Sequence, residues 1–261
     1  MSQRSPAARA TAEAIGRPRA FRATSRSRRS RSSFAASSQP QQMSRKGSAT
    51  PSGLVLFDKP AGPSSFAIVR DVRERTGARA GHAGTLDPFA TGLLLILLGA
   101  FTKQAQKFVG LSKRYETAID LAAVTSTGDP EGEIVAEHDP LSEDELRARV
   151  EDLRGEVDLR IPTASAVKIG GERAYKLHRR GISVDMPTRR TTVHDLDLLD
   201  YDGRVAGLAV HISSGGYVRS LAEALGGHCV SLRRTHVGPF DVADADPQRI
   251  IPPDDAVAPL R

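Results

Sequence analysis

Tryptophan is absent from this chain of 261 residues, and cysteine occurs once, at Cys229. A single cysteine excludes an internal disulfide framework and a zinc site built on cysteines, and it fits a reducing compartment. Its neighbour His228 could serve as the base of a cysteine nucleophile, but adjacent residues of a strand point to opposite faces. We therefore interpret Cys229 as a small buried apolar residue. Aromatic residues make up 5% of the chain, so the core must be aliphatic.

Long apolar segments are missing as well. The longest apolar run, residues 92–100, is too short to cross a bilayer, and there is no apolar signal peptide. We expect a cytoplasmic protein without membrane contact, with import into an organelle through the N-terminal segment as the alternative. The histidines and acids show no spacing typical of a metal site, so we expect no metal.

Acidic residues are scarce at the N-terminal end. Residues 1–52 hold eleven of the 37 lysines and arginines but one of the 31 acids, a net charge of +10 that leaves −4 for residues 53–261. This Arg- and Ser-rich segment has no apolar period and is predicted to be disordered. Three interpretations stay open: a basic arm that adds RNA affinity, a transit peptide, or an over-extended start with translation beginning at Met43. RNA binding by the remainder must rest on local clusters of charge.

A folded domain is predicted from residue 53 to residue 250, followed by a short C-terminal tail, 251–261. Ser64 or Ser65 is placed to cap a helix that ends at Gly77, and Ser142 with Glu145 has the pattern of a capping box. We expect helices at residues 64–77, 102–110, 142–155, 174–181 and 217–227, strands at 53–60, 92–99 and 113–123, and antiparallel strands within 191–212.

The order of these elements indicates the fold class. Strands and helices are mixed without a βαβ rhythm. The sequence therefore predicts an α+β fold with a mixed, mostly antiparallel central sheet flanked by helices. The apolar run 92–99 has the length of a strand and is expected at the centre of that sheet.

The segment GARAGHAGTLDPFATGLLLILLGAFTK, residues 77–103, holds the first candidate site. Asp87 lies in a glycine-rich loop before the apolar run. It either initiates a turn, as Asp before Pro commonly does, or presents a carboxylate as nucleophile or general base on a rigid support. His82, in the same loop, either orients a ligand or is a solvated side chain.

Three further residues have a functional and a structural interpretation each. Tyr115 is either a half-buried strand residue or a ring that stacks on a flipped base and takes part in acid–base chemistry. Arg219 falls in the first turn of a helix, where cations are disfavoured, so we expect a buried carboxylate partner. An Arg–Asp pair would lower the pKa of the carboxyl by about 1–3 units and keep it ionised. Lys59 either contacts substrate or is a solvated turn residue beside Asp58.

Five segments in this order carry a resemblance: GLVLFDKPAGPSS, GHAGTLDPFATGLLLILLGAFTK, KRYETAIDLAAVTSTGDPEGEI, PTASAVKIGGERAYKLHRRG and SSGGYVRSLAEALGG. Together they resemble the successive motifs of the TruB family of tRNA pseudouridine synthases, over about residues 53–246. The G-H-x-G-x-L-D-P block distinguishes this family from other pseudouridine synthase families.

The resemblance implies an isomerase that converts the uridine at position 55, in the T-loop of tRNA, to pseudouridine without a cofactor or metal. It implies that Asp87 is the essential catalytic group, acting on the ribose C1′ or on the base. Tyr115 corresponds to the tyrosine that stacks on the target base and is implicated in proton removal from C5. Arg219 corresponds to the arginine that pairs with the aspartate, and His82 to the histidine that fills space vacated by flipped T-loop bases. We expect a monomer that binds the tRNA T-arm.

Further residues are predicted to bind the substrate. In the motifs these are Lys59, Gly84, Thr85 and Tyr217. A second group is expected to contact phosphates, unless it is simply an exposed helix face: Arg173, Lys176, Arg179 and Arg180.

The sequence departs from the family pattern in two places. Gly216 stands before Tyr217 where the family usually has threonine, which removes one hydroxyl. We also expect no C-terminal PUA domain, because the chain stops at Arg261, so the basic N-terminal segment is a candidate to strengthen tRNA binding.

Other functions compete with this interpretation. One is a non-catalytic tRNA-binding or tRNA-folding factor on the same scaffold, against which the presence of Asp87, Tyr115 and Arg219 argues. Another is a glycosidase, which needs a second carboxylate such as Asp58, Asp129 or Glu131, with no spacing that selects one. The family member that works within a guide-RNA particle is disfavoured, because it too relies on a PUA domain.

Overall fold

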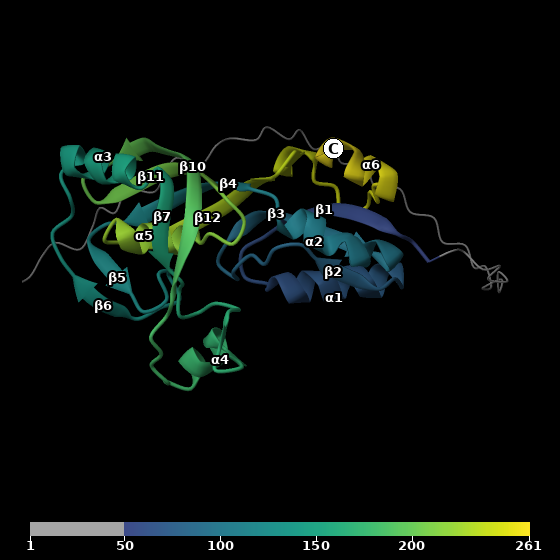
Figure 1. The fold of residues 1–261 in the computed structure, drawn as a ribbon, viewed down its shortest axis with the longest axis horizontal. Helices are drawn as coiled ribbons and strands as arrows, with labels where there is room; N and C mark the ends of the chain where they lie inside the picture. The colour runs from purple at the N-terminus through teal and green to yellow at the C-terminus, as the bar shows by residue number, and fades with distance from the viewer. Residues whose placement is uncertain (1–49) are drawn as a thin grey trace, which may run out of the picture. The chain divides into compact units, whose positions relative to one another are not determined.

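A mixed sheet of nine strands forms the centre of the fold (Figure 1). We describe residues 50–261 of a computed structural model, so the predictions for residues 1–49, including disorder and the start at Met43, lie outside the described residues. The strand order is β1-β3-β12-β4-β11-β10-β7, with β2 beside β3 and β13 beside β12. The bounds are β1 Gly53–Lys59, β2 Ala80–His82, β3 Thr91–Leu98, β4 Lys113–Asp120, β7 Gly155–Arg160, β10 Thr188–Tyr201, β11 Val205–Ile212, β12 His228–Val237 and β13 Phe240–Asp241.

All neighbouring strands of this sheet are antiparallel except β3 and β12, which run parallel. The predicted α+β fold with a mostly antiparallel central sheet is therefore confirmed. The predicted strand pair within residues 191–212 is the β10–β11 hairpin. Two small hairpins lie outside the sheet: β5 Ala123–Thr125 with β6 Ile134–Glu137, and β8 Lys168–Ile169 with β9 Glu172–Arg173.

Six α-helices accompany these strands in the part of the chain described. They are α1 Ser65–Thr76, α2 Ala105–Val109, α3 Glu143–Asp152, α4 Ala174–Arg179, α5 Val218–Ala224 and α6 Pro253–Val257. In Figure 1, α4 lies away from the central sheet, in the segment that connects β7 to β10. No helix among residues 50–261 is long and apolar enough to span a membrane.

The predicted helix caps are present. Ser64 accepts a hydrogen bond from the backbone N–H of Ala67 at the start of α1, and Gly77 ends the helix in the left-handed conformation. Ser142 and Glu145 form the predicted capping box of α3. These local signals fix where α1 and α3 begin.

The apolar run before residue 99 forms β3, which is buried on both faces. Leu94, Ile96 and Leu98 belong to the larger core cluster, which also contains the inner face of α1. The alternate residues, Leu93, Leu95 and Leu97, belong to a second cluster with Phe101 and Phe108. A strand covered on both faces needs apolar residues at every position, and this explains the continuous run.

Two predicted segments differ from the structure. The helix expected at 102–110 begins as a 3-10 helix, Gly99–Gln104, and only α2 is α-helical. The predicted C-terminal tail is instead part of the compact unit Gly47–Arg261. Leu54 and Ile251 exchange two backbone hydrogen bonds of 2.9 and 2.8 Å, and Ala256 of α6 is fully buried. The segment therefore pairs with β1 and helps to cover the second core cluster.

Candidate active site

Asp87 lies in the loop between β2 and β3, opposite Arg219 of α5. Arg219 Nε is 3.0 Å from Asp87 Oδ2. The Arg219 side chain is 2% exposed, whereas Asp87 keeps 31% of its side-chain surface accessible. The carboxylate partner expected for Arg219 is therefore present. The pair combines a buried cation with a carboxylate that still reaches solvent.

The loop around Asp87 is fixed to the rest of the fold on its N-terminal side. Ser65, the first residue of α1, donates its hydroxyl to the carbonyl of Leu86 at 2.9 Å and accepts the N–H of Leu86 at 2.8 Å. The carbonyl of Asp87 accepts the N–H of Ala90, so Asp87 also begins a turn, as the Asp-Pro pattern suggests. The backbone of Asp87 thus makes the turn while its carboxylate pairs with Arg219.

Arg219 contacts a second carboxylate, Asp129, which lies in the β5–β6 turn. Arg219 Nη1 is 3.3 Å from Asp129 Oδ2, and Asp129 is almost fully buried. The guanidinium also donates to the carbonyls of Thr127 and Ala164, at 2.7 and 2.9 Å. Because these acceptors come from separate segments, they leave the guanidinium little freedom to move away from Asp87.

Asp129 is itself held in place by its own turn. Thr127 donates its hydroxyl to Asp129 Oδ1 at 2.6 Å, and the N–H of Glu131 reaches the same oxygen at 3.1 Å. Thr125 donates to the carbonyl of Asp129 at 2.8 Å. This role of Asp129 was not predicted from the sequence, in which Asp129 is only a candidate glycosidase acid. The motif TSTGDPEG was the available signal, because three hydroxyl residues there precede an acid in a turn.

The electrostatics of Asp87 differ from the expectation. Burial of the carboxyl raises its pKa, the Arg219 guanidinium opposes this, and the negative charge of Asp129 adds to the rise. The net direction is upward. The lowering of the pKa by Arg219 is as predicted, but burial of the Asp87 carboxyl outweighs it.

His82 is the last residue of β2 and is half-buried, so it is not a freely solvated side chain. Its Nδ1 atom is buried without a hydrogen-bond partner within residues 50–261. Burial, with a smaller contribution from the nearby charge of Arg234, lowers the pKa of His82. The lowered pKa favours the neutral imidazole at neutral pH.

Tyr115 lies on β4, half-buried against the larger core cluster. Across the sheet, Arg234 of β12 pairs with Tyr115 on one side and with Gly92 of β3 on the other. Tyr115 is therefore two strand spacings, about 10 Å, from the strand that follows the Asp87 loop. This placement fits both interpretations of Tyr115, the structural and the functional one.

Lys59 is fully buried. Its Nζ donates to the carbonyls of Pro60, Pro63 and Pro88, at 2.8, 2.9 and 3.1 Å. It is neither a solvated turn residue nor accessible to RNA, so its predicted substrate contact is not supported. Instead, Lys59 ties the end of β1 to the residue after Asp87.

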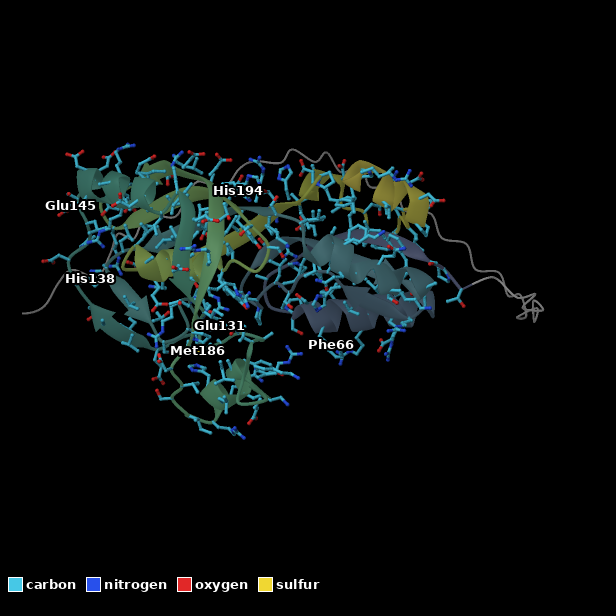
Figure 2. The ribbon with its side chains drawn as sticks, viewed as in Figure 1. Phe66, Glu131, His138, Glu145, Met186 and His194 are labelled. Atoms are coloured by element: carbon cyan, nitrogen blue, oxygen red, sulfur yellow. The ribbon has the colours of Figure 1, made fainter. Side chains whose placement is uncertain are left out.

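Gly84 and Thr85 lie before Asp87 in the same loop. Their carbonyls accept hydrogen bonds from Arg234, and Thr85 is exposed. Tyr217 immediately precedes α5 and packs, half-buried, against the small cluster that contains Ala174 and Met186. Gly84 and Thr85 are thus beside Asp87, whereas Tyr217 connects α5 to the α4 segment, where Met186 also lies (Figure 2).

The basic residues predicted to contact phosphates are exposed in and around α4. Arg180 pairs with Glu172 at 2.7 Å, and Arg173 donates to the carbonyl of Ala166 at 2.7 Å. Arg179 lies over the ring of Tyr175, 5.7 Å from its centroid. Lys176 is exposed between them. The group presents positive charge to solvent in the segment that lies away from the sheet.

The glycosidase interpretation loses support from the positions of the candidate acids. Asp58 pairs at the surface with Arg233, at 2.8 Å, and Asp129 is bound to Arg219. Glu131 is exposed to solvent.

Within residues 50–261 there is no group of three or more side chains that could together bind a metal ion.

A protein-family model and several known proteins match this chain. The model of the TruB family pseudouridylate synthase (N terminal domain) matches residues 72–218. The chain is 43% identical over 208 residues to tRNA pseudouridine synthase B of Corynebacterium glutamicum, covering 75% of this chain and 70% of the relative. It is 42% identical over 202 residues to tRNA pseudouridine synthase B of Pseudomonas aeruginosa, covering 74% and 66% respectively.

Solved structures share the fold. A chain in the crystal structure of a Cbf5-Nop10-Gar1 complex matches with a TM-score of 0.56 and 28% identity, covering 72% of this chain and 50% of the other. A chain of an H/ACA RNP bound to a substrate RNA containing 2′-deoxyuridine matches with a TM-score of 0.54 and 26% identity, covering 72% and 48%. This chain therefore spans about half the length of those two proteins.

Proposed function

The chain belongs to the TruB family of pseudouridylate synthases, and on this premise we propose that it isomerises uridine to pseudouridine in the T-loop of tRNA, at position 55. The observation that carries the proposal is the accessible Asp87 carboxylate held by the buried Arg219. A carboxylate on a fixed loop, paired with a cation, is suited to reaction with a sugar or a base. The curated relatives named above are tRNA pseudouridine synthases B.

The reaction rearranges bonds within one nucleotide. The bond between N1 and C1′ breaks, uracil rotates, and a bond forms between C5 and C1′. The proton lost from C5 is balanced by the proton gained at N1, so nothing is oxidised or reduced and no co-substrate is consumed. We propose that the Asp87 carboxylate acts on C1′ or on the base in the bond-breaking step.

The neighbouring residues have supporting roles in this proposal. Arg219 keeps the carboxylate in position, and its charge favours the ionised form that the reaction needs. Tyr115 stacks on the extruded uracil and assists proton removal from C5, while neutral His82 fills the space that flipped T-loop bases leave. Flipping costs a few kcal/mol, and less for a base that is already exposed in a loop.

The exposed basic residues of the α4 segment are proposed to bind the phosphates of the tRNA T-arm. Thr85 is exposed beside Asp87 and is proposed to contact the substrate at the loop itself. Their contacts within the chain, such as the pair of Arg180 with Glu172, are at the surface and can be exchanged for phosphate.

The test is an assay of the purified chain with an unmodified tRNA transcript in the presence of EDTA, with pseudouridine mapped at single-nucleotide resolution. Asp87→Asn removes the charge of the candidate catalytic group. Asp71→Asn is the matched control, because Asp71 forms an exposed pair with Arg75 on α1. A second transcript carries cytidine in place of the T-loop uridine.

We expect pseudouridine at the T-loop uridine only, with the wild-type chain and with Asp71→Asn, and none with Asp87→Asn or with the cytidine transcript. Product from Asp87→Asn would exclude Asp87 as the essential group. Product at other positions would exclude the proposed T-loop specificity. Tight binding without any product would support the tRNA-folding factor instead.

A further inference from the structure

Arg234 of β12 is 1% exposed, although it carries a full positive charge. Its hydrogen-bond partners in the described chain are all backbone carbonyls, so its charge is not matched by a carboxylate in contact with it. A buried guanidinium without a counter-ion is costly, and an apolar side chain would fill such a position at a lower cost. The presence of arginine here therefore requires a reason other than packing.

The carbonyls that Arg234 contacts lie on both sides of Asp87. On one side, Nη2 donates to Gly84 at 3.1 Å and Nη1 to Thr85 at 3.4 Å. On the other side, Nε donates to Leu93 at 2.7 Å. The guanidinium is planar and its donors are fixed relative to one another, so one rigid group joins the two ends of the loop.

The backbone of Arg234 packs closely against the backbone of β3. Gly92 pairs with Arg234 where β12 runs parallel to β3, and its φ is 101°, a conformation that favours glycine. A Cβ atom at this position would lie 2.2 Å from the carbonyl oxygen of Arg234. Because residue 92 is glycine, the backbone of Arg234 can lie against β3. From there the Arg234 side chain reaches the carbonyls of Gly84 and Thr85.

We propose that Arg234 is a positioning residue for Asp87, which joins Gly84 and Thr85 to Leu93 of β3 and so fixes the Asp87 loop from both ends, so that the carboxylate stays at its reactive position. The catalytic part of this inference rests on the proposed function. Lys59 supports the same loop from the other direction, through the carbonyl of Pro88. The loop that carries the candidate catalytic group is thus held by two buried cations through its backbone.

The test compares Arg234→Lys with Arg233→Met. Lysine keeps the charge, but its single ammonium cannot reproduce the fork that joins Leu93 to Gly84 and Thr85. Arg233 is the adjacent residue, and its side chain pairs with Asp58 at the surface, so its replacement removes a charge and no side-chain hydrogen bond to the Asp87 loop. Three quantities are measured: hydrogen exchange of the amides of residues 84–92, the single-turnover rate of pseudouridine formation, and the dissociation constant for tRNA.

We expect Arg234→Lys to lose exchange protection within residues 84–92 while β4 and β11 keep theirs. We expect its single-turnover rate to fall about 10- to 100-fold, since a misplacement of about 1 Å can cost this much, with tRNA affinity changed less than about twofold. Arg233→Met should match the wild-type chain in all three. Unchanged loop protection, or a uniform loss across the sheet, would overturn the inference in favour of a general core role.

The exchange measurement does not depend on the substrate, so it tests the inference even if the wild-type chain makes no pseudouridine, an outcome that would refute only the proposed function. If Arg234→Lys unfolds at 25 °C, the measurements are made at 10 °C with trimethylamine oxide, which favours the compact state. Failure to fold there as well would assign Arg234 to the core and overturn the inference.

Discussion

Arg219 determines the geometry of the candidate site at the scale of single residues, because its guanidinium contacts Asp87 and Asp129 at the same time. The two carboxylates differ in exposure: Asp129 is buried and bound by its own turn, whereas Asp87 reaches solvent. A buried carboxylate that holds an arginine in place does not need to react. We therefore propose that Asp129 orients Arg219, whereas Asp87 is the group that acts on the substrate.

The first prediction concerns Asp129→Asn, which keeps the shape of the side chain and removes its charge. Without the ion pair to Nη1, Arg219 should lose its fixed orientation, and the single-turnover rate should fall about 10- to 100-fold. Affinity for tRNA should stay close to that of the wild-type chain, because Asp129 is buried. The control is Asp197→Asn, an exposed acid that pairs with Arg154. A wild-type rate for Asp129→Asn would remove Asp129 from the site.

The second prediction concerns pH. If the reaction needs ionised Asp87, the rate falls as pH drops through the Asp87 pKa, which lies above the ordinary value of about 3.9 because of burial. Arg219 lowers this pKa and Asp129 raises it. The acidic limb of the single-turnover pH profile should therefore move to higher pH in Arg219→Gln and to lower pH in Asp129→Asn. Shifts in the same direction in both variants would contradict this electrostatic assignment.

The contact within the candidate site that the sequence predicted is one that the motifs report directly. Asp87 and Arg219 were predicted together, and the structure has them in contact. Arg234 was missed because a basic residue in the segment SLRRTHVG looks like one of several surface charges. Lys59 was misassigned for a related reason, since burial of a lysine by three carbonyls follows from tertiary structure and not from local pattern.

At the scale of elements, helix α1 links the Asp87 loop to the surface. Its first residue, Ser65, is bonded to Leu86, and the next residue, Phe66, is 71% exposed. Figure 2 shows Phe66 at the lower edge of α1. Arg70 and Arg73 follow at helical spacing on the same side and are also exposed. An exposed aromatic ring with two arginines beside the Asp87 loop is a combination suited to single-stranded RNA.

The third prediction is that Phe66 stacks on a base of the tRNA substrate. Phe66→Ala should raise the dissociation constant for tRNA about 5-fold or more, since stacking contributes about 1–3 kcal/mol per base. Phe66→Trp should bind as well as the wild-type chain. The control is Leu199→Ala, an apolar residue on β10 that is 61% exposed. Unchanged tRNA affinity in Phe66→Ala would show that the ring does not contact RNA.

Elements with strong local signals were predicted well. The capping residues of α1 and α3 and the alternation in β10 and β11 act through neighbours in the sequence, so the starts of both helices and the presence of the two strands were predicted. The segment after β3 was less predictable. Residues 99–104 form a 3-10 helix, although an α-helix was expected from residue 102. Ser52 donates to the carbonyl of Leu98, just before this 3-10 helix, and accepts the N–H of Phe101 within it. That contact spans 49 residues, so a local pattern does not report it.

At the scale of the whole molecule, the two ends of the described chain meet. The C-terminal segment pairs with β1 through Leu54 and Ile251, so it is part of the fold and not a tail. The sequence did not predict this, because backbone pairing between residues about 200 positions apart leaves no periodic signal in so short a segment. The fold class was predictable, because it follows from the number and order of elements rather than from their contacts.

The distribution of charge is the second feature at this scale. The net charge of +6 comes from the N-terminal residues, since residues 53–261 carry −4. A body of negative net charge can bind tRNA only through local positive regions such as that around α4. The N-terminal segment adds eleven positive charges at one end of the chain, which is enough to change the salt dependence of RNA binding if that segment takes part.

The fourth prediction tests this contribution with a chain that begins at Gly47, the first residue of the compact unit. Each phosphate contact that is lost reduces the slope of log affinity against log salt by about 0.7–0.9, because fewer counterions are released. If the basic segment binds RNA, the shortened chain should bind tRNA more weakly at low salt and with a shallower slope, and the two chains should converge at high salt. The modified position in tRNA should be the same for both, since Asp87 and its neighbours are unchanged. Equal affinities and equal slopes would show that residues 1–46 do not contribute to tRNA binding, and would leave the α4 region and α1 to supply the contacts.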